Sequence, residues 1–426
     1  MAKAIFEIDS LFFKKALYFS KSFENVCLFQ SNDFQDQYSN VSSLLAIGAN
    51  DFISINNKAA FDQIENFKSQ YPNQWIPGFL GYDLKNEQED LTTRHPNEIG
   101  FPDAYFFLPE IILEIDDNQV QITADNPQII FHNILISEEN QFPNVYHGQI
   151  RSRMSRDSYI QAFNSLKKHI QLGDLYEANL CQEFYDDNAQ LSNPEDLYLT
   201  LNEISPTPFS SFFKINDKYI LSASPERFLA KRANVLISQP IKGTAARGIN
   251  QELDDQLKLE LSQNTKEIAE NVMIVDLVRN DLTRSAVAGT VKVVEKLGVY
   301  TFKHVHQMIS TITCEKNQDL SDLEVLKRTF PAGSMTGAPK ISALQLCDRY
   351  ENSRRGIYAG AIGYFAPNGD FDFNVVIRTI LYNRENKYLS FHTGSAITIE
   401  ANAASEYAEC LVKASAILKA LGKSID

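Results

Sequence analysis

The segment "IYAGAIGYFAPNGDFDFNVVIRTILYNRENKYLSFHTGSAIT" (residues 357–398) decides the fold class. Short runs of apolar, aromatic and β-branched residues are separated in it by polar turns, and one turn holds Asn368-Gly369, a dipeptide typical of hairpins. The segment therefore predicts three strands joined by turns. The same pattern in "YILSASPERFLAKRANVLISQPI" (residues 219–241) predicts further strands.

Helices are expected on both sides of these strands. Helical spacing begins near Tyr159 and near Ala403, and it runs through "TKEIAENVMIVDLVRNDLT" (residues 265–283). Strands and helices do not alternate strictly, so the pattern predicts an α+β fold rather than a doubly wound α/β fold.

Two regions are predicted along the chain. Residues 1–136 mix short apolar runs with polar turns, which is typical of strands. The polar segment "SEENQFPNVYHGQIRSRMSRDS" (residues 137–158) contains Pro143 and Gly148 and has no periodicity, so it reads as a linker. We place a boundary there, between a β-rich N-terminal region at 1–150 and a C-terminal region at 151–426.

Charge and cysteine content narrow the class of protein. The formal net charge is −14 over 426 residues, which argues against broad binding to nucleic acid or to anionic membranes. Five scattered cysteines form no CxxC pair, which favours a reducing cytoplasm. The N-terminus does not read as a signal peptide, and no apolar run is long enough for a membrane helix.

Lys242 is the first candidate functional residue. It lies in "PIKGTAARG" (residues 240–248), where a Pro-x-x-Gly sequence predicts a turn. The turn can simply join two strands and leave the lysine in water. Alternatively, the lysine points inward, toward something that needs a positive charge or a nucleophile.

Two predicted helices carry glutamates at helical spacing. Glu267 and Glu270 share a face with apolar residues, and Glu406 and Glu409 repeat the pattern beside small residues. Two such helices side by side offer hard oxygen ligands of the kind that Mg²⁺ takes. The alternative is that all four glutamates are solvated on helix surfaces.

Three other features are ambiguous when taken alone. Arg378 is expected in an apolar strand, either buried to meet an anion or exposed at an edge. The loop "AGSMTGAPK" (residues 332–340) either donates backbone N–H groups to an anion or forms an ordinary turn. His304 and His306 can face the same way on a strand, but no third metal ligand stands at an obvious spacing.

The ordered motifs of the C-terminal two-thirds together resemble the chorismate-utilising enzymes. They are "GDLYEANL", "SASPERF", "PIKGTAARG", "AENVMIVDLVRNDL", "HVHQMISTI", "GSMTGAPKISALQL", "RRGIYAGAIGYF", "FNVVIRT" and "ASEYAECLVKASA", with weaker echoes at 28–33 and 78–86. The resemblance implies an α+β fold with a two-layered β-sandwich core flanked by helices. Within the family, Lys242 makes the chain most similar to the aminodeoxychorismate synthase branch, which serves para-aminobenzoate and folate synthesis.

The resemblance also implies a mechanism. Lys242 would attack C2 of the chorismate ring and displace the C4 hydroxyl, which Glu226 would protonate as it leaves. Ammonia would then enter at C4 and expel the lysine. The family uses Mg²⁺ to hold the ring carboxylate, and Glu270 and Glu409 match its ligands. Ammonia would come from a separate glutamine amidotransferase, because no Cys-His-Glu set of that kind is apparent here.

The remaining matches concern substrate binding. Tyr358 and Arg378 match residues that hold the enolpyruvyl carboxylate. Other matching positions line the pocket or lie in its small-residue loop: Thr244, Gly394, Lys413, Ser334 and Thr336. Chorismate is a dianion, so a chain of charge −14 must concentrate cations locally to bind it.

Three positions depart from the family pattern and keep other functions open. Gln307 stands where the family has a histidine, Glu177 where the amino-transferring branches have glutamine, and Ala396 where the family has glycine. A glutamate at 177 disfavours isochorismate synthesis but could still activate water. The alternatives are therefore an anthranilate or isochorismate synthase and, in another class, a non-catalytic chorismate- or tryptophan-binding subunit.

Overall fold

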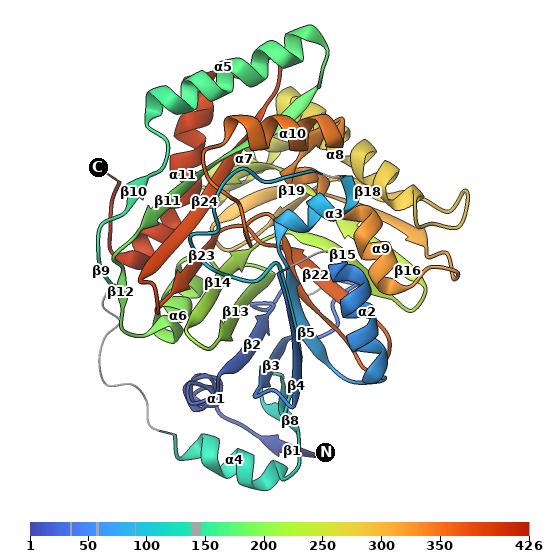
Figure 1. The fold of residues 1–426 in the computed structure, drawn as a ribbon, viewed down its shortest axis with the longest axis vertical. Helices are drawn as coiled ribbons and strands as arrows, with labels where there is room; N and C mark the ends of the chain where they lie inside the picture. Colours follow the sequence, from blue (N-terminus) through green and yellow to red (C-terminus); the bar gives the residue numbers. More distant parts are fainter. Residues whose placement is uncertain (35, 57–58, 90, 138–145, 426) are drawn as a thin grey trace.

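The structure, a computed structural model, describes residues 1–34, 36–56, 59–89, 91–137 and 146–425. Two large, mainly antiparallel sheets form the body of the molecule (Figure 1). The predicted α+β fold with a two-layered core is confirmed. The predicted linker falls partly outside the described residues, since its positions 138–145 are not among them.

The first sheet has twelve strands. In spatial order they are β1 (Ala2–Glu7), β8 (Gln119–Ala124), β7 (Ile111–Ile115), β3 (Ser43–Ile47), β2 (Asn25–Gln30), β13 (Phe209–Ile215), β14 (Lys218–Ser224), β23 (Thr379–Asn383), β24 (Tyr388–Ile397), β11 (Glu177–Asp186) and β10 (Arg151–Ser152), and β20 (Gly337–Ala338) pairs with β11. The long strands β24 and β11 are buried along almost their whole length, because the other sheet or helices cover both faces.

The second sheet has ten strands. In order they are β17 (Ile241–Ala246), β19 (Val305–Glu315), β16 (Val235–Gln239), β15 (Arg227–Arg232), β22 (Phe371–Val375), β21 (Ala361–Phe365), β5 (Ile76–Leu80), β6 (Ala104–Leu108) and β4 (Asp51–Ile55), and β18 (Lys292–Thr301) pairs with β19. A separate pair joins β9 (Tyr146–His147) to β12 (Gln190–Leu191).

The segment 357–398 contributes four strands rather than the three expected. Strands β21 and β22 belong to the ten-stranded sheet and are joined through the turn at Asn368-Gly369, where Gly369 has φ +85°. Strands β23 and β24 belong to the twelve-stranded sheet. The run "FNVVIRTILY" read as one strand, but the chain leaves one sheet and enters the other within it.

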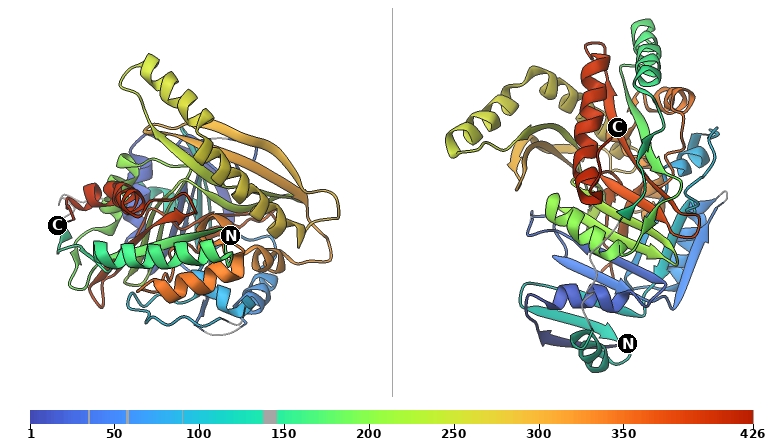
Figure 2. Two further views of the ribbon diagram at one scale, coloured as in Figure 1. Left: turned by 90° about the horizontal axis from the view of Figure 1, so that it is seen from above. Right: turned by 90° about the vertical axis from the view of Figure 1, so that its left-hand side faces the viewer.

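Helices cover the outer faces of the two sheets (Figures 1 and 2). They are α1 (Phe12–Ser20), α2 (Ala60–Gln70), α3 (Lys85–Glu89), α4 (Pro127–Leu135), α5 (Arg156–Leu172), α6 (Pro194–Ile204), α7 (Gln251–Gln263), α8 (Thr265–Thr283), α9 (Asp322–Thr329), α10 (Lys340–Tyr350) and α11 (Ala403–Leu421), with short 3₁₀ turns η1 (Tyr82–Leu84) and η2 (Gly333–Met335). Within the described residues, none is both long and apolar enough to cross a membrane.

The helices predicted at 265–283 and from Ala403 are confirmed as α8 and α11. Asparagine side chains fix both starts: Asn264 accepts from the backbone of Lys266, and Asn402 accepts from that of Ala404. Gly422 ends α11 in the left-handed conformation (φ +64°). These two helices carry the four glutamates singled out in the sequence.

The boundary near residue 150 does not separate the sheets. Strand β2 pairs with β13, and β5 pairs with β21, so each large sheet takes strands from both sides of the boundary. The first part of the chain therefore completes the same β-core that carries the later motifs. The division at residue 150 stays a prediction about the sequence, without a matching break in the sheets.

Aromatic side chains fill the space between the two sheets. The ring of Phe213, on β13, lies 5.5 Å from that of Phe79 on β5 and 5.8 Å from that of Phe107 on β6, and it is fully buried. We expect Phe213→Ala to lower the free energy of unfolding by about 3–5 kcal/mol, through lost apolar burial and a residual cavity. The measurement is urea denaturation followed by fluorescence.

The matched control is Phe52→Ala, which removes a half-exposed ring from β4. That change should cost less than about 1 kcal/mol, as most surface substitutions do. Equal losses in the two variants would contradict this account of the inter-sheet core.

Candidate active site

A cavity of about 710 Å³ lies between the C-terminal helices and the two sheets. Its walls come from β17, β19 and β24, from the loop after β14, from the crossing between β22 and β23, and from α8 and α11. The predicted site residues that line it are Glu226, Lys242, Thr244, Glu270, Ser334, Tyr358, Arg378, Gly394, Glu409 and Lys413. The fold thus gathers residues that are up to 187 positions apart (413 − 226) into one space.

Thr336 is the exception among the predicted residues. It is buried, does not line the cavity, and its hydroxyl donates to the carbonyl of Gly333 at 3.0 Å. The hydroxyl therefore closes the 3₁₀ turn η2. That turn places Ser334 in the cavity wall, so Thr336 supports the site without facing it.

Lys242 lies on a bulged edge strand, so the prediction of a turn is wrong. In β17, Ile241 pairs with Ile309 and Thr244 pairs with Gln307, which leaves one extra residue between the two pairs. Gly243 has φ +94° within this bulge. A bulge changes the direction of the neighbouring side chain, and here Lys242 lines the cavity.

A buried carboxylate holds the Lys242 side chain. Its Nζ donates to Oε1 of Glu177 at 2.9 Å, and Glu177 is only 1% exposed. Burial alone would lower the pKa of Lys242, but the carboxylates of Glu177 and Glu270 outweigh it, so the pKa of Lys242 lies above its ordinary value. In this structure Lys242 is therefore an ammonium group.

Glu226 lies in the "SPERF" segment, in the turn between β14 and β15. The side chain is buried, and burial raises its pKa to about 7, although the hydroxyl of Ser334 and the charge of Lys242 act in the opposite direction. A carboxyl group of this kind is about half protonated at neutral pH, whereas an ordinary glutamate is almost fully ionised. It has the property required of a general acid.

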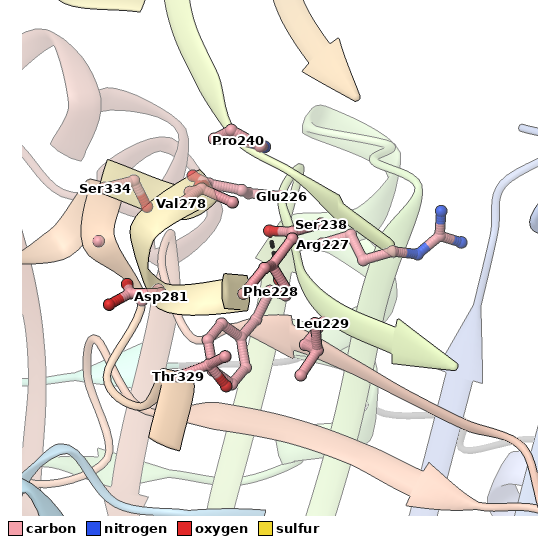
Figure 3. A pocket seen from close by; sticks show the side chains of 13 residues that line it. Glu226, Arg227, Phe228, Leu229, Ser238, Pro240, Val278, Asp281, Thr329 and Ser334 are labelled. Atoms are coloured by element: carbon pink, nitrogen blue, oxygen red, sulfur yellow. Dashed lines mark hydrogen bonds between the residues drawn. The ribbon is translucent and has the colours of Figure 1, made fainter. Parts of the chain in front are cut away.

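Glu226 also lines a second, small cavity of about 20 Å³, together with Ser334, Val278 and Asp281. In Figure 3, Ser334, Val278 and Glu226 appear in a row, with Asp281 below them. Glu226 thus lies between this small cavity and the large one, and its side chain is buried. That position explains the desolvation of its carboxyl group.

Arg378 lies between β22 and β23, not within a strand as predicted. The chain crosses there from one sheet to the other, and Arg378 takes the left-handed conformation with φ +51°. Its side chain lines the cavity, and no ion pair of Arg378 is found among the described residues. Burial lowers the pKa of its guanidinium, and Glu226 opposes that effect. A guanidinium without a carboxylate partner is suited to an anionic ligand.

The predicted metal ligands line the cavity from two helices. Glu270 Oε1, on α8, is buried and has no hydrogen-bond partner among the described residues; Lys266 is 3.7 Å away. Burial raises the pKa of Glu270 to about 7, against the effect of Lys242 and Lys266. Glu409, on α11, pairs with Lys413 at 2.7 Å. An unpartnered buried oxygen in a cavity that a second carboxylate also lines fits a hard cation.

The other two glutamates of these helices, Glu406 and Glu267, differ from each other in position. Glu406 is buried on α11 and pairs with Lys266 at 3.3 Å, which joins α11 to α8 across the cavity. Glu267 lines the cavity and is more exposed. Among the described residues, no three His, Cys, Asp or Glu side chains gather into a preformed metal site.

The far wall of the cavity is formed by β24 and its neighbours. Gly394 lines it, and a Cβ there would lie 2.8 Å from Cys181 Sγ, so a larger residue does not fit. Its carbonyl accepts from Lys413 Nζ at 2.9 Å. The ring of Tyr358 stacks on that of His392, with centroids 5.0 Å apart, and both residues line the cavity.

The structure also shows where two positions that depart from the family pattern lie. Gln307 and Ala396 line the cavity. His306 is buried and faces away, with Nε2 at 3.0 Å from Asp254 and Nδ1 at 3.0 Å from Thr301. His306 therefore cannot substitute for a histidine at 307, because neighbouring residues of β19 face opposite sides.

Sequence reasoning missed Lys266 and His392. Lys266 stands four residues before Glu270 on α8, so helical spacing alone could have placed it beside that carboxylate. His392 precedes Gly394 by two residues on β24, so strand alternation puts both on the cavity side. The contact between Lys242 and Glu177 had no signal in the sequence, since 65 residues separate them.

Comparison with known proteins agrees with this geometry. Residues 24–419 match the family described as "chorismate binding enzyme". The chain is 34% identical over 351 residues to aminodeoxychorismate synthase component 1 of Escherichia coli K12, covering 81% of this chain and 76% of that protein. It is also 34% identical to an anthranilate synthase component I-like protein of Synechocystis, covering 82% and 72% of the two chains.

The fold has a close counterpart among solved structures. Anthranilate synthase component I from Streptococcus pneumoniae superposes with a TM-score of 0.78 at 25% identity, covering 90% of this chain and 95% of that one. The chain belongs to the chorismate-binding enzyme family, and it is a chorismate-utilising enzyme. Relatives with different activities match it about equally well.

Proposed function

We propose that this enzyme aminates chorismate at C4 to give 4-amino-4-deoxychorismate, the precursor of para-aminobenzoate and folate. The observation that carries the proposal is Lys242 in the cavity wall, on a bulge that directs its amine inward, with Glu226 in the same wall. A nucleophile and a proton-bearing carboxyl in one cavity are what displacement of a ring hydroxyl requires. Four relatives named aminodeoxychorismate synthase, at 30–35% identity, support it.

The steps follow from these side chains. Neutral Lys242 attacks C2 of the ring, the double bonds shift, and the C4 hydroxyl leaves as water with the proton of Glu226. Ammonia adds at C4, and Lys242 departs from C2. Arg378 and Lys413 supply positive charge for the carboxylates of chorismate, and Tyr358 forms the neighbouring wall.

The ammonia is proposed to come from a separate glutamine amidotransferase. Such an enzyme needs an accessible nucleophilic cysteine, and all five cysteines of this chain are buried and unpaired. Unpaired cysteines also fit the cytoplasm, where thiols stay reduced.

Mg²⁺ is the proposed cofactor, with Glu270 and Glu409 as its protein ligands. The described lining of the cavity includes as many acidic as basic side chains: Glu226, Glu267, Glu270, Glu406 and Glu409 against Lys242, Lys266, Arg378, Lys413 and Lys419. A dianionic substrate needs a surplus of positive charge, which a divalent ion would supply. When bound, the ion would hold the ring carboxylate and neutralise its charge.

The metal assignment predicts the behaviour of two variants. Glu270→Gln and Glu409→Gln should each raise the Mg²⁺ concentration for half-maximal activity by at least about tenfold, because each loses a charged oxygen ligand. Isothermal titration with Mg²⁺ in the presence of chorismate checks binding directly. Glu260→Gln, on the exposed face of α7, is the control. Unchanged Mg²⁺ binding in both variants would refute the assignment.

Product identity tests the proposed function. The purified chain is incubated with chorismate, Mg²⁺ and excess ammonium at mildly alkaline pH, where free ammonia is present, and the products are analysed by mass spectrometry and NMR. An amine at C4 on a ring that keeps its enolpyruvyl group supports the proposal. Anthranilate or isochorismate refutes it in favour of a sibling activity. Chorismate binding without any product favours a non-catalytic subunit.

A further inference from the structure

Glu177 is a buried carboxylate that the steps above do not use. It is the first residue of β11, its backbone pairs with Ala338 of β20, and its side chain is 1% exposed. Lys242 is among the described residues that line the cavity, and Glu177 is not. Glu177 therefore reaches the substrate space only through Lys242.

The contacts of the two carboxylate oxygens are unequal. Oε1 accepts the hydrogen bond from Lys242 Nζ at 2.9 Å, whereas Oε2 is buried and has no hydrogen-bond partner among the described residues. Oε2 therefore has lone pairs that no donor among the described residues uses, and a proton can be held there.

Lys242 must lose a proton before it can react. An ammonium group has no lone pair, so it must lose a proton before it can attack a carbon atom. The carboxylates around Lys242 keep it charged, and the nearest acceptor for its proton is Glu177. Transfer of a proton from Lys242 to Glu177 leaves the net charge of the site unchanged. An uncompensated charge would be costly there, because the site is desolvated.

We propose that Glu177 is a positioning residue that also accepts the proton of Lys242 and so converts it into a nucleophile. The inference rests on the proposed C4 amination, and it assigns to Glu177 the step that precedes it. One N–H bond of Lys242 breaks and one O–H bond forms on Glu177. After ammonia has expelled the neutral lysine from C2, Glu177 returns the proton to it. The new cationic nitrogen at C4 gives a proton to Glu226, so both acids regain their starting states.

Other carboxylates face Lys242 but are unsuited to this role. Glu226 must already carry a proton for the leaving hydroxyl, and Glu270 and Glu409 are the proposed metal ligands. Among the described contacts, no hydrogen bond joins Lys242 to any of these three. Glu177 alone combines a direct hydrogen bond with a position outside the substrate cavity.

The test compares Glu177→Gln with the wild-type enzyme. Glutamine has the same shape and still accepts from Lys242, but it does not take up the proton. Turnover is measured with saturating Mg²⁺ and chorismate and with the free ammonia concentration held constant at each pH. We expect kcat to fall about 10²-fold at pH 7, with KM for chorismate changed less than about threefold.

The pH dependence separates proton transfer from a merely structural effect. In the variant Lys242 must lose its proton to solvent, so the ratio of variant to wild-type kcat should rise about tenfold for each pH unit above 7, until Lys242 is neutral. The titration of Glu226 is common to both proteins and cancels in the ratio. A ratio that stays constant with pH overturns the proposal.

A second readout does not depend on turnover. Carbamoylation of Lys242 by cyanate, followed by mass spectrometry of its peptide, reports the neutral amine. At pH 8 we expect labelling about tenfold slower in Glu177→Gln, as for turnover at that pH, since the neutral amine that forms by proton transfer to Glu177 is lost. Equal labelling overturns the inference whichever product the enzyme makes. If the wild-type enzyme forms no C4-aminated product, the proposed function fails, and with it the acceptor role.

Glu183→Gln is the matched control. Glu183 lies on the same strand, is also buried, and pairs with a cation, Arg153, at 2.9 Å, but it does not line the cavity. This variant should keep the wild-type pH profile and the wild-type labelling of Lys242. If it shows the same profile as Glu177→Gln, the effect is a general one of lost charge in β11, and the proposal is overturned.

Discussion

Lys242→Ala is expected to lower C4 amination by roughly 10³-fold or more while chorismate still binds, because the described lining of the cavity offers the covalent route no other nucleophile at that place. Arg378 and Lys413 remain to attract the carboxylates of the substrate. Turnover is measured by liquid chromatography of the aminated product, and chorismate binding by isothermal titration.

A variant that preserves the positive charge separates loss of activity from loss of folding. Lys242→Ala leaves Glu177 buried without its partner, which can destabilise the protein. Lys242→Arg keeps a cation beside that carboxylate, but a guanidinium is not deprotonated in proteins and cannot act as the nucleophile. We expect Lys242→Arg to melt near the wild-type temperature and to be as inactive as Lys242→Ala. Near-full activity in either variant would refute the covalent mechanism.

Glu226→Gln should lower kcat by about 10²–10⁴-fold, the usual contribution of a positioned acid or base. The pKa of Glu226 is raised to about 7 by burial. As an acid it must be protonated, so its contribution is complete well below pH 7 and declines as the pH rises through about 7. The measurement is kcat against pH at constant free ammonia, and the descending limb near pH 7 should disappear in the variant.

The size of the loss should itself depend on pH. The ratio of wild-type to variant kcat is expected to be greatest below pH 7 and to shrink above it, because the wild-type carboxyl becomes a carboxylate there. Glu226→Asp retains a carboxylic acid, but its side chain is shorter by one methylene group. This variant should therefore keep the descending limb of the pH profile, with a lower kcat. A variant Glu226→Gln that retains the same limb would assign the titration to another group.

The changes at Lys242 and at Glu226 test the nucleophile and the acid of the same displacement reaction. Lys242 lies on the bulge of β17 and Glu226 in the turn between β14 and β15, and both line the same cavity. The nucleophile must be neutral and the acid must be protonated, which are opposite demands on neighbouring groups. Glu177 meets the first demand and the enclosure of Glu226 meets the second.

Much of the fold was predictable from local pattern. The helices at 265–283 and from Ala403, the strands around residues 219–241 and the hairpin at Asn368-Gly369 were all expected and are confirmed. These elements have strong periodicity or definite capping and turn residues, which act over a few positions along the chain. The same local signals placed Glu270 and Glu409 on helices.

Two local predictions were wrong for a common reason. The Pro-x-x-Gly sequence at residues 240–243 is part of a bulged strand, and the apolar run around Arg378 is a crossing between sheets. In both places the pairing of distant strands decides the backbone: β19 imposes the bulge on β17, and β22 and β23 belong to different sheets. Propensity read from neighbours along the chain does not contain that information.

By itself, the sequence determined the elements, the ordered motifs and the residue types that form the site. Only the tertiary structure decided that Glu177 holds Lys242 across 65 positions, that Lys266 joins α8 to Glu406 of α11, and that Thr336 faces away from the cavity. Charge and burial depend on what surrounds a side chain in space. Those surroundings come from strands and helices that are far apart along the chain, so packing, rather than spacing, sets the protonation states on which the chemistry depends.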